Sequence, residues 1–510
     1  MKIADTPYIK VLFLIITFTL LALTGIFKSL TIRPQSVHQW AQCDRASVAY
    51  IFGSESLNIM EPQTHNIENG SGITGMEFPL LNYCAGLLYR IFGFHEIIYR
   101  LLVFTIALFG LLAAFEIAMY YTGSPISSSL TVLSFSFSPV LLYYMPNFLP
   151  DTASVGFIIL AWLFFLKLQK TFKSKYLFLM GLFTLLACLI KISSFISVIA
   201  MVVIVILDYF HFFSSKNSIT IFNKKRSSIL ITLGTVSLTV FSWYYYASWL
   251  SEVNNSNVFL LKAKITFSPD EIIDNIIFIK NLWWQQYYSV YFYYAILASS
   301  IFIIAFRKHA PKMLSAITTL LWLGNLSFSF LMLSQFRDHD YYIITLLPVI
   351  FFHLLLFSKV FLSVFESKKI VGLVVLNVLL IAITTNGFLF CRDNLNLRHN
   401  KDGWMSSPDA YEKYFDLHTQ LKKLGVSDDA LVLSIVDDSP NISLYLMNHR
   451  GFTVSAYEDN KSIEEKINSL KSKNSYIIMN DSSYLEKNIS GISNRKIMGT
   501  INGLIIIDNN

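Results

Sequence analysis

Residues 192–212 read ISSFISVIAMVVIVILDYFHF and contain only one Asp, Glu, Lys or Arg side chain, Asp208. An apolar run of about 20 residues is long enough to cross the ~30 Å hydrocarbon core of a bilayer as a helix. Over the whole chain of 510 residues, 54% are hydrophobic and only 14% are charged. The mean hydropathy is +0.52. A soluble protein of this length could not bury so much apolar surface, so the sequence predicts an all-α polytopic membrane bundle.

Eleven stretches are long and apolar enough to be spans: 10–31, 97–120, 125–145, 151–170, 175–191, 192–212, 227–249, 287–306, 312–334, 340–358 and 369–391. Lys2 and Lys10 precede the apolar core of the first stretch, a pattern that also fits a cleaved signal peptide. No clear small-x-small cleavage site follows it, so we interpret it as a membrane anchor.

The basic residues predict the orientation of the spans. With eleven spans, the Lys- and Arg-bearing loops 167–175, 213–227, 307–312 and 359–369 fall on the same side as Lys2 and Lys10. Cytoplasmic loops carry an excess of Lys and Arg. We therefore expect a cytoplasmic N-terminus and a C-terminus outside.

Three outer segments are too large to be simple connectors: 32–96, 250–286 and 392–510. The composition changes after residue 391, which predicts a membrane domain over 1–391, with 32–96 as its first outer loop, and a soluble extracytoplasmic domain over 392–510. Apolar residues at helical spacing end at Gly425, a typical helix C-cap. A second helix fits 461–473, and strands fit 430–436, 475–479, 495–500 and 503–507. The tail is therefore predicted to be a small α/β domain, acting as a lid or as an acceptor-binding module.

Polar and charged residues gather on the predicted outer face. The first loop carries His38-x-Trp40-x-Gln42-x-Asp44 and then Glu77-Phe78-Pro79-Leu80. Later connections carry Pro150-Asp151, Lys191, Arg337 and His339-Asp340-Tyr341-Tyr342. Taken singly, each charge could be a solvated loop residue, and Asp151 could simply cap its helix. Because charges near membrane depth are costly, their common side predicts one charged pocket.

In this order, these motifs resemble the bacterial relatives of the protein O-mannosyltransferases and of the lipid A aminoarabinose transferase. These are GT-C class integral-membrane glycosyltransferases with a polyprenyl-phosphate sugar as donor, and the resemblance covers about residues 10–390. It implies a multi-pass protein of a bacterial inner membrane, acting on a lipid, glycan or protein acceptor at its outer face. It also implies that the first outer loop, 32–96, is catalytic.

Two departures from the family pattern concern the first loop. A Lys-Pro-Pro of the aminoarabinose transferase stands here as Glu77-Phe78-Pro79, and the paired acidic residues of the mannosyltransferases are reduced to Asp44. The donor contacts must therefore differ, and the sugar and the acceptor stay open.

The chemistry of such a transfer suits these residues. Phosphate is a good leaving group, so the reaction needs a base for the acceptor hydroxyl and cations for the phosphate. Asp44 is expected to be the base, with Asp151 and Glu77 positioning it or the acceptor. The expected substrate-binding residues are His38, Gln42, Lys191, Arg337, His339, Tyr341 and Tyr342. The three carboxylates could instead bind a divalent metal; no other cofactor is expected.

Two other functions remain open. A transporter of lipid-linked or small substrates has a similar size, but transporters usually show internal repeats and broken helices at matching positions, and no repeat is evident. A lipid-linked polysaccharide polymerase or ligase would share the donor and differ only in its product. The sequence shows no basic stripe for nucleic acid, and its four cysteines show no metal-binding spacing.

Overall fold

A computed structural model describes residues 7–213, 222, 225–256, 258–259, 265, 268–399, 409–470, 473–487, 489, 491–492 and 495–509. Among the basic residues used to predict the topology, Lys2, Lys216 and Lys224 lie outside the described residues. The chain divides into two compact units. The first comprises Met1–Ser29, Leu101–Trp243 and Lys262–Leu397, and the second comprises Leu30–Arg100, Tyr244–Leu261 and Arg398–Asn510.

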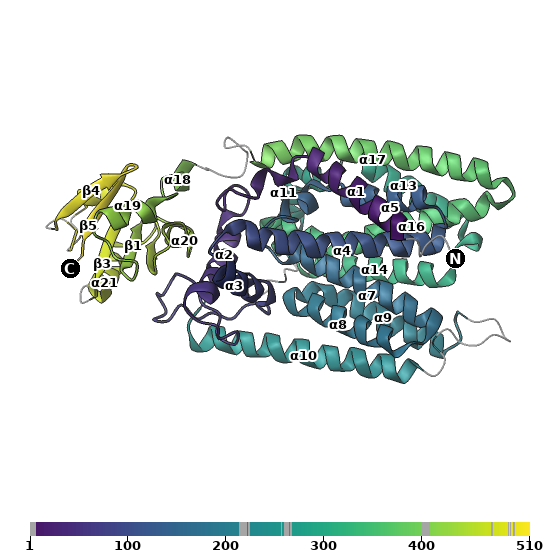
Figure 1. Cartoon of the computed structure of the whole chain (residues 1–510), viewed down its shortest axis with the longest axis horizontal. Helices are drawn as coiled ribbons and strands as arrows, with labels where there is room; N and C mark the ends of the chain where they lie inside the picture. The colour runs from purple at the N-terminus through teal and green to yellow at the C-terminus, as the bar shows by residue number, and fades with distance from the viewer. Residues whose placement is uncertain are drawn as a thin grey trace. The chain divides into compact units, whose positions relative to one another are not determined.

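The first unit is a bundle of helices (Figure 1). Its described elements, three of which continue into residues of the second unit, are α1 (Pro7–Leu23), η1 (Ile26–Ser29), α4 (Glu96–Thr122), α5 (Pro125–Ser136), α6 (Pro139–Tyr144), α7 (Asp151–Thr171), α8 (Ser174–Ile190), η2 (Ile192–Ser194), α9 (Phe195–Tyr209), α10 (Arg226–Val253), α11 (Pro269–Leu282), α12 (Trp284–Tyr287), α13 (Val290–Ala305), η4 (Arg307–His309), α14 (Lys312–Leu331), α15 (Leu333–Asp338), η5 (Asp340–Leu346), α16 (Leu347–Val364), η6 (Glu366–Lys368) and α17 (Lys369–His399).

Within the described part of the chain, seven helical segments are long and apolar enough to cross a membrane: Glu96–Thr122, Asp151–Thr171, Ile192–Tyr209, Arg226–Val253, Lys312–Leu331, Asp340–Val364 and Glu366–His399. Shorter apolar helices cover Pro7–Leu23, Leu80–Phe92, Ser174–Ile190 and Val290–Ala305. All but one of the predicted spans coincide with one of these helices. The predicted helical membrane bundle is confirmed, while the number of eleven spans stays a prediction.

The exception is the predicted span 125–145, which is broken into α5 and α6. Pro139 has no backbone N–H and cannot continue the hydrogen bonds of α5, but it fits the first position of a new helix. The chain leaves α5 at Ser136 and restarts at Pro139.

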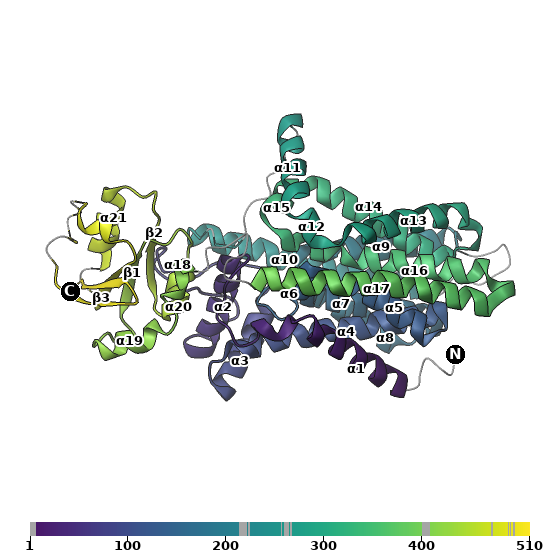
Figure 2. The ribbon, with the colours of Figure 1, turned by 90° about the horizontal axis from the view of Figure 1, so that it is seen from above.

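Helix α7 lies inside the bundle and sets the position of its first residue, Asp151. Figures 1 and 2 both place it beside α8. Its approach to α4 is so close that a Cβ on Gly110 would lie 2.4 Å from the Cα of Gly156. The Trp162 side chain is fully buried and its Nε1 donates to Ser197 of α9 at 3.1 Å. Asp151 is therefore held on a rigid element.

The second unit contains the first outer loop. Its two helices, α2 (Gln39–Ser54) and α3 (Leu80–Phe92), pack directly on each other. A Cβ on Gly86 of α3 would lie 2.6 Å from the Cβ of Phe52 of α2, so glycine is required for this contact. Helix α2 is buried on nearly all sides, including the positions of Gln42, Asp44 and Arg45.

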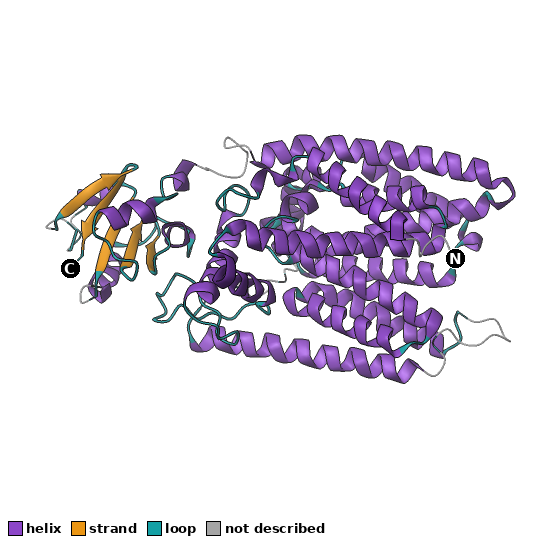
Figure 3. Cartoon of the chain, viewed as in Figure 1, coloured by secondary structure: helices purple, strands orange, loops and turns teal. Residues whose placement is uncertain are grey.

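The C-terminal part of the second unit holds the strands of the described chain (Figure 3). The sheet has the order β2-β1-β3-β5-β4, with β1 parallel to β2 and β3, and β5 antiparallel to β3 and β4. The described elements of this C-terminal part are α18 (Asp409–Glu412), α19 (Leu417–Lys423), β1 (Leu431–Ile435), α20 (Ile442–Met447), β2 (Gly451–Val454), α21 (Asn460–Leu470), β3 (Ser475–Met479), η7 (Ser482–Leu485), β4 (Ile497–Ile501) and β5 (Leu504–Asp508). The predicted small α/β domain is confirmed, and Gly425 follows α19 with φ +90°.

The tail and the first loop share hydrogen bonds inside the second unit. The backbone N–H of Ile67 donates to the Gly451 carbonyl at 2.9 Å, and the N–H of Gly451 donates to the His65 carbonyl at 3.0 Å. Lys466 of α21 forms an ion pair with Glu68 at 3.0 Å. Residues 65–67 thus run along the edge of β2. The predicted domain boundary at residues 391 and 392 stays a prediction.

Candidate functional site

The first cluster of predicted site residues lies in the second unit, around Asp44 of α2. The Asp44 side chain is 1% exposed. Burial in the protein interior is the largest cause that raises the pKa of this carboxyl group, to about 8. The Arg45 guanidinium opposes this shift, whereas the Asp437 carboxylate adds to it. Asp44 therefore has the properties of a base that titrates near neutral pH.

Two neighbours of Asp44 come from the loop that follows β1 and leads into α20. The Asn441 amide favours the charged form of Asp44 and lowers its pKa, although neither carboxylate oxygen of Asp44 has a hydrogen-bond partner among the described residues. Asp437 is fixed by its own contacts: it accepts from the hydroxyl of Tyr411 at 2.7 Å and from the backbone N–H of Ser443 at 2.8 Å. The tail thus supplies part of the surroundings of Asp44.

Glu77 is paired with Arg45. The guanidinium Nη2 lies 2.9 Å from the Glu77 carboxylate, and both side chains are largely buried. The Arg45 guanidinium also lies over the ring of Phe259, with 5.4 Å from Cζ to the ring centroid. This ion pair fixes Arg45, whose charge is the largest factor that favours the ionised form of Asp44.

His38 and Gln42 shape the start of α2. His38 precedes the helix with φ 52°, and its ring lies edge-on to Trp40 at 6.2 Å. The Gln42 amide nitrogen donates to the carbonyls of Gln35 and Val37 at 3.0 and 2.9 Å. Gln42 therefore holds the turn that leads into α2, and its role toward a substrate stays a prediction.

The second cluster lies in the first unit, where Lys191 meets Asp151. Lys191 interrupts the helical path between α8 and η2, with φ −156° and ψ 109°. Its Nζ lies 2.7 Å from Oδ1 of Asp151, which is fully buried. The same Nζ lies 5.3 Å and 4.5 Å from the ring centroids of Tyr341 and Tyr342. Opposite charge and aromatic faces together stabilise a cation in this largely buried place.

His339 joins this cluster through the same two aromatic rings. Its ring lies 5.4 Å from that of Tyr341 and 5.5 Å from that of Tyr342. Arg337 has other neighbours: its guanidinium lies 5.1 Å from the ring of Phe278 and donates to Asn275 at 3.4 Å. The structure thus brings Asp151, Lys191, His339, Tyr341 and Tyr342 together, and directs Arg337 toward α11.

A helix start beside Lys191 adds hydrogen-bond donors. Helical backbone runs from Ile192 to Tyr209, so its first N–H groups and the positive end of its dipole lie directly after Lys191. The Ser193 side chain is 5% exposed, and its hydroxyl has no hydrogen-bond partner in the described structure. A cation, a free hydroxyl and a helix N-terminus at one place suit a phosphate group.

A shared metal site was the alternative role for the three carboxylates. Among the described residues, no group of three or more His, Cys, Asp or Glu side chains is placed to hold a metal ion. Two of these carboxylates have basic partners, Arg45 for Glu77 and Lys191 for Asp151.

The residues that the sequence argument missed are Asp437 and Asn441. A signal for them existed, because the segment Asp437-Asp438-Ser439-Pro440-Asn441 directly follows a predicted buried strand. Polar residues at the carboxyl end of a parallel strand often form binding sites. What could not be read from the sequence is that this loop faces the first outer loop.

Comparisons with known proteins agree with the predicted resemblance. Residues 77–246 match the model of the dolichyl-phosphate-mannose-protein mannosyltransferase family. No curated protein is significantly similar to the chain in sequence.

Several solved structures share the fold. The crystal structure of ArnT from Cupriavidus metallidurans in the apo state has a TM-score of 0.61 and 11% identity, over 98% of this chain and 97% of that one. The same protein bound to undecaprenyl phosphate has a TM-score of 0.60 and 14% identity, over 98% of both chains. The Archaeoglobus fulgidus oligosaccharyltransferase in complex with Zn and sulfate has a TM-score of 0.51 and 12% identity, over 90% of this chain and 68% of that one. The chain is thus a multi-pass membrane protein with the fold of these proteins, and its predicted resemblance to GT-C glycosyltransferases is confirmed.

Proposed function

We propose that the chain is an integral-membrane glycosyltransferase that moves a sugar from a polyprenyl-phosphate donor to an acceptor on the outer face of a bacterial inner membrane. The observation that carries this proposal is the phosphate-type site around Lys191 and Ser193 in a chain built largely of apolar helices. The solved relative that binds undecaprenyl phosphate supports the same class of donor.

In the proposed reaction, an acceptor hydroxyl attacks the anomeric carbon of the donor sugar. The bond from that carbon to the phosphate oxygen breaks, and its electron pair leaves on the phosphate. Asp44 takes the proton of the attacking hydroxyl, and its pKa of about 8 is close to the value at which a base works best near neutral pH. Lys191, with the donors at the start of the following helix, stabilises the charge that develops on the phosphate.

Asp151 has a positioning role in this proposal. It fixes Lys191 through the 2.7 Å ion pair and is itself inaccessible to solvent. Asp151→Asn should therefore weaken donor binding through Lys191 without removing the base. Asp44→Asn should instead remove the base and leave donor binding nearly unchanged. The two variants separate the two roles.

The experiment compares surface glycans, glycolipids and membrane lipids of cells with and without the gene by mass spectrometry. The proposal predicts that one glycoconjugate loses a sugar and that a polyprenyl-phosphate sugar of the same residue mass accumulates. Restoring the wild-type gene should reverse both changes. A loss of chain elongation instead would indicate a polymerase. An unchanged lipid pool would contradict a lipid-linked donor.

A further inference from the structure

A cavity lies in the second unit, and Asp44 is not among the residues that line it. It has a volume of about 630 Å³, which is in the range of small-molecule sites. The C-terminal end of α2 forms one side of it with Tyr50, Ser54 and Glu55. The opposite side comes from the tail, with Asn448 and Arg450. Neither side has a role in the proposed transfer chemistry.

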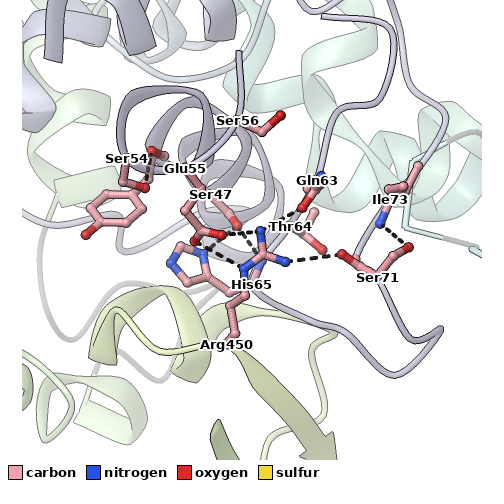
Figure 4. Close-up of polar contacts among 12 residues, drawn as sticks. Ser47, Ser54, Glu55, Ser56, Gln63, Thr64, His65, Ser71, Ile73 and Arg450 are labelled. Atoms are coloured by element: carbon pink, nitrogen blue, oxygen red, sulfur yellow. Dashed lines mark hydrogen bonds and ion pairs between the residues drawn. The ribbon is translucent and has the colours of Figure 1, made fainter. Parts of the chain in front are cut away.

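The framework of this cavity is held by Arg450 (Figure 4). Its guanidinium forms an ion pair with Glu55 at 2.7 Å, donates to the side chain of Gln63 at 2.7 Å and donates to the Ser71 carbonyl at 3.1 Å. Because these contacts reach three separate points of the first loop, they fix the wall of the cavity. Arg450 is thus occupied as a structural residue.

A chain of hydrogen bonds ends at the Tyr50 hydroxyl. His65 is 1% exposed, and burial lowers its pKa to about 3, so its ring is neutral. Its Nε2 faces the Asn448 side-chain oxygen at 3.4 Å and therefore carries the proton, while its Nδ1 accepts from the Ser47 hydroxyl at 2.7 Å. The Asn448 nitrogen then donates to the Tyr50 hydroxyl at 2.6 Å.

This direction of donation leaves the Tyr50 proton available. The hydroxyl already accepts from Asn448, and within the described structure its own proton has no acceptor. Burial raises the pKa of Tyr50 above its ordinary value, so the phenol stays protonated at neutral pH. A ligand in the cavity that offers a hydroxyl or carbonyl oxygen would complete the chain.

The charges of the lining disfavour an anion. Glu55 is paired with Arg450, and Asp428 is paired with Lys422 at 2.7 Å, so the lining presents no uncompensated cation. Asp429 adds a further negative charge. A lining with several hydrogen-bonding groups and no excess positive charge fits an uncharged polyhydroxylated ligand, not a phosphate.

We propose that this cavity binds an uncharged saccharide portion of the acceptor, with the Tyr50 hydroxyl donating to one of its oxygens. The inference rests on the proposed function, which supplies a sugar-bearing acceptor. Tyr50 lies six residues after Asp44 on the same helix. This spacing is a rise of roughly 9 Å and places the two side chains on different faces. The cavity is therefore a recognition subsite, separate from the base.

The test uses the full chain in nanodiscs, without donor. Ligand-observed NMR measures binding of uncharged methyl glycosides of glucose, galactose, mannose and N-acetylglucosamine, and of inorganic phosphate in a separate arm. At least one glycoside should bind the wild type. Tyr50→Phe should weaken this binding about three- to tenfold, the usual effect of losing one neutral hydrogen bond. Asn448→Gly removes the amide that donates a hydrogen bond to the Tyr50 hydroxyl, and should weaken glycoside binding similarly. Glycine is chosen because it adopts the φ of 57° at this position without strain.

Tyr89→Phe is the matched control. Like Tyr50, Tyr89 lies edge-on to Phe94, but among the described residues its buried hydroxyl has no hydrogen-bond partner, and it does not line the cavity. It should bind glycosides as the wild type does. The proposal is overturned if no glycoside binds, if phosphate alone binds, or if Tyr50→Phe and Tyr89→Phe behave alike. A separate reaction, with donor added, measures donor consumption. If the wild type does not consume donor, this result counts against the proposed function, whereas glycoside binding tests the cavity alone.

Discussion

Replacing Asp44 by asparagine should stabilise the fold while it abolishes transfer. The pKa of Asp44 is about 8 in the folded chain, and its ordinary value of 3.8 applies to the unfolded chain. At any pH between these values, this carboxyl group takes up a proton when the chain folds. In this window the folded state binds more protons than the unfolded state, so the free energy of unfolding falls as the pH rises. Asparagine is neutral and of similar size, and does not carry this cost.

The magnitude follows from the pKa values. About three pH units separate pH 7 from the ordinary carboxyl pKa of 3.8, and each unit corresponds to about 1.4 kcal/mol. The stabilisation by Asp44→Asn at pH 7 therefore has an upper bound of roughly 4 kcal/mol. At pH 5 the same reasoning gives only about 1.5 kcal/mol. The stabilisation by Asp44→Asn should therefore grow as the pH rises from 5 to 8.

The assay is thermal unfolding of the purified chain in detergent, followed by tryptophan fluorescence at pH 5, 7 and 8. Asp44→Asn should raise the midpoint by several degrees at pH 7, and by less at pH 5. Asp274→Asn, an exposed change on α11, is the control and should stay within about 0.5 kcal/mol of the wild type. A midpoint that falls at pH 8, or a shift that does not depend on pH, would refute the argument that Asp44 is buried at a cost.

The remaining predictions concern activity and topology. The rate of transfer should rise about tenfold per pH unit well below pH 8 and level off above it, since only ionised Asp44 accepts a proton. A transfer rate that does not change between pH 6 and 8 would show that Asp44 is not the base. Lys191→Ala should weaken donor binding by about 2–5 kcal/mol in a vesicle binding assay, whereas Lys170→Ala, at the far end of α7, should not; equal affinities would leave Lys191 with a structural role only. A reporter active only outside the cytoplasm should work when fused after residue 66, 254 or 510 and be silent near 172, 220 or 309, and activity at 220 would overturn the predicted orientation.

Much of the fold follows from local sequence patterns. Apolar length predicted the helices of the bundle, because a bilayer requires backbone hydrogen bonds to be satisfied within each span. Helical spacing and the cap residue predicted the end of α19 before Gly425, and a short strand was predicted at the residues of β3, 475–479. The break at Pro139 was also visible in the sequence, but the hydropathy of 125–145 concealed it.

The candidate site was less predictable, because its contacts join distant parts of the chain. The motif of the first loop pointed to Asp44, but the loop at Asp437 lies almost 400 residues later in sequence. The pairings of Arg45 with Glu77 and of Lys191 with Asp151 likewise depend on tertiary packing. Residue type and side of the membrane could suggest candidates, but only the structure shows which charges neutralise each other.

The most direct measurement of the central claim uses lipids from cells that lack the gene, in which the donor is expected to accumulate. Purified wild-type chain is reconstituted into vesicles of this lipid extract together with cell-envelope acceptor, and the polyprenyl lipids are followed by mass spectrometry. The wild type should convert a polyprenyl-phosphate sugar to free polyprenyl phosphate, while Asp44→Asn should leave it intact. Conversion by Asp44→Asn at the wild-type rate would contradict the role of Asp44 as the base, and no conversion by the wild type would contradict the proposed transfer.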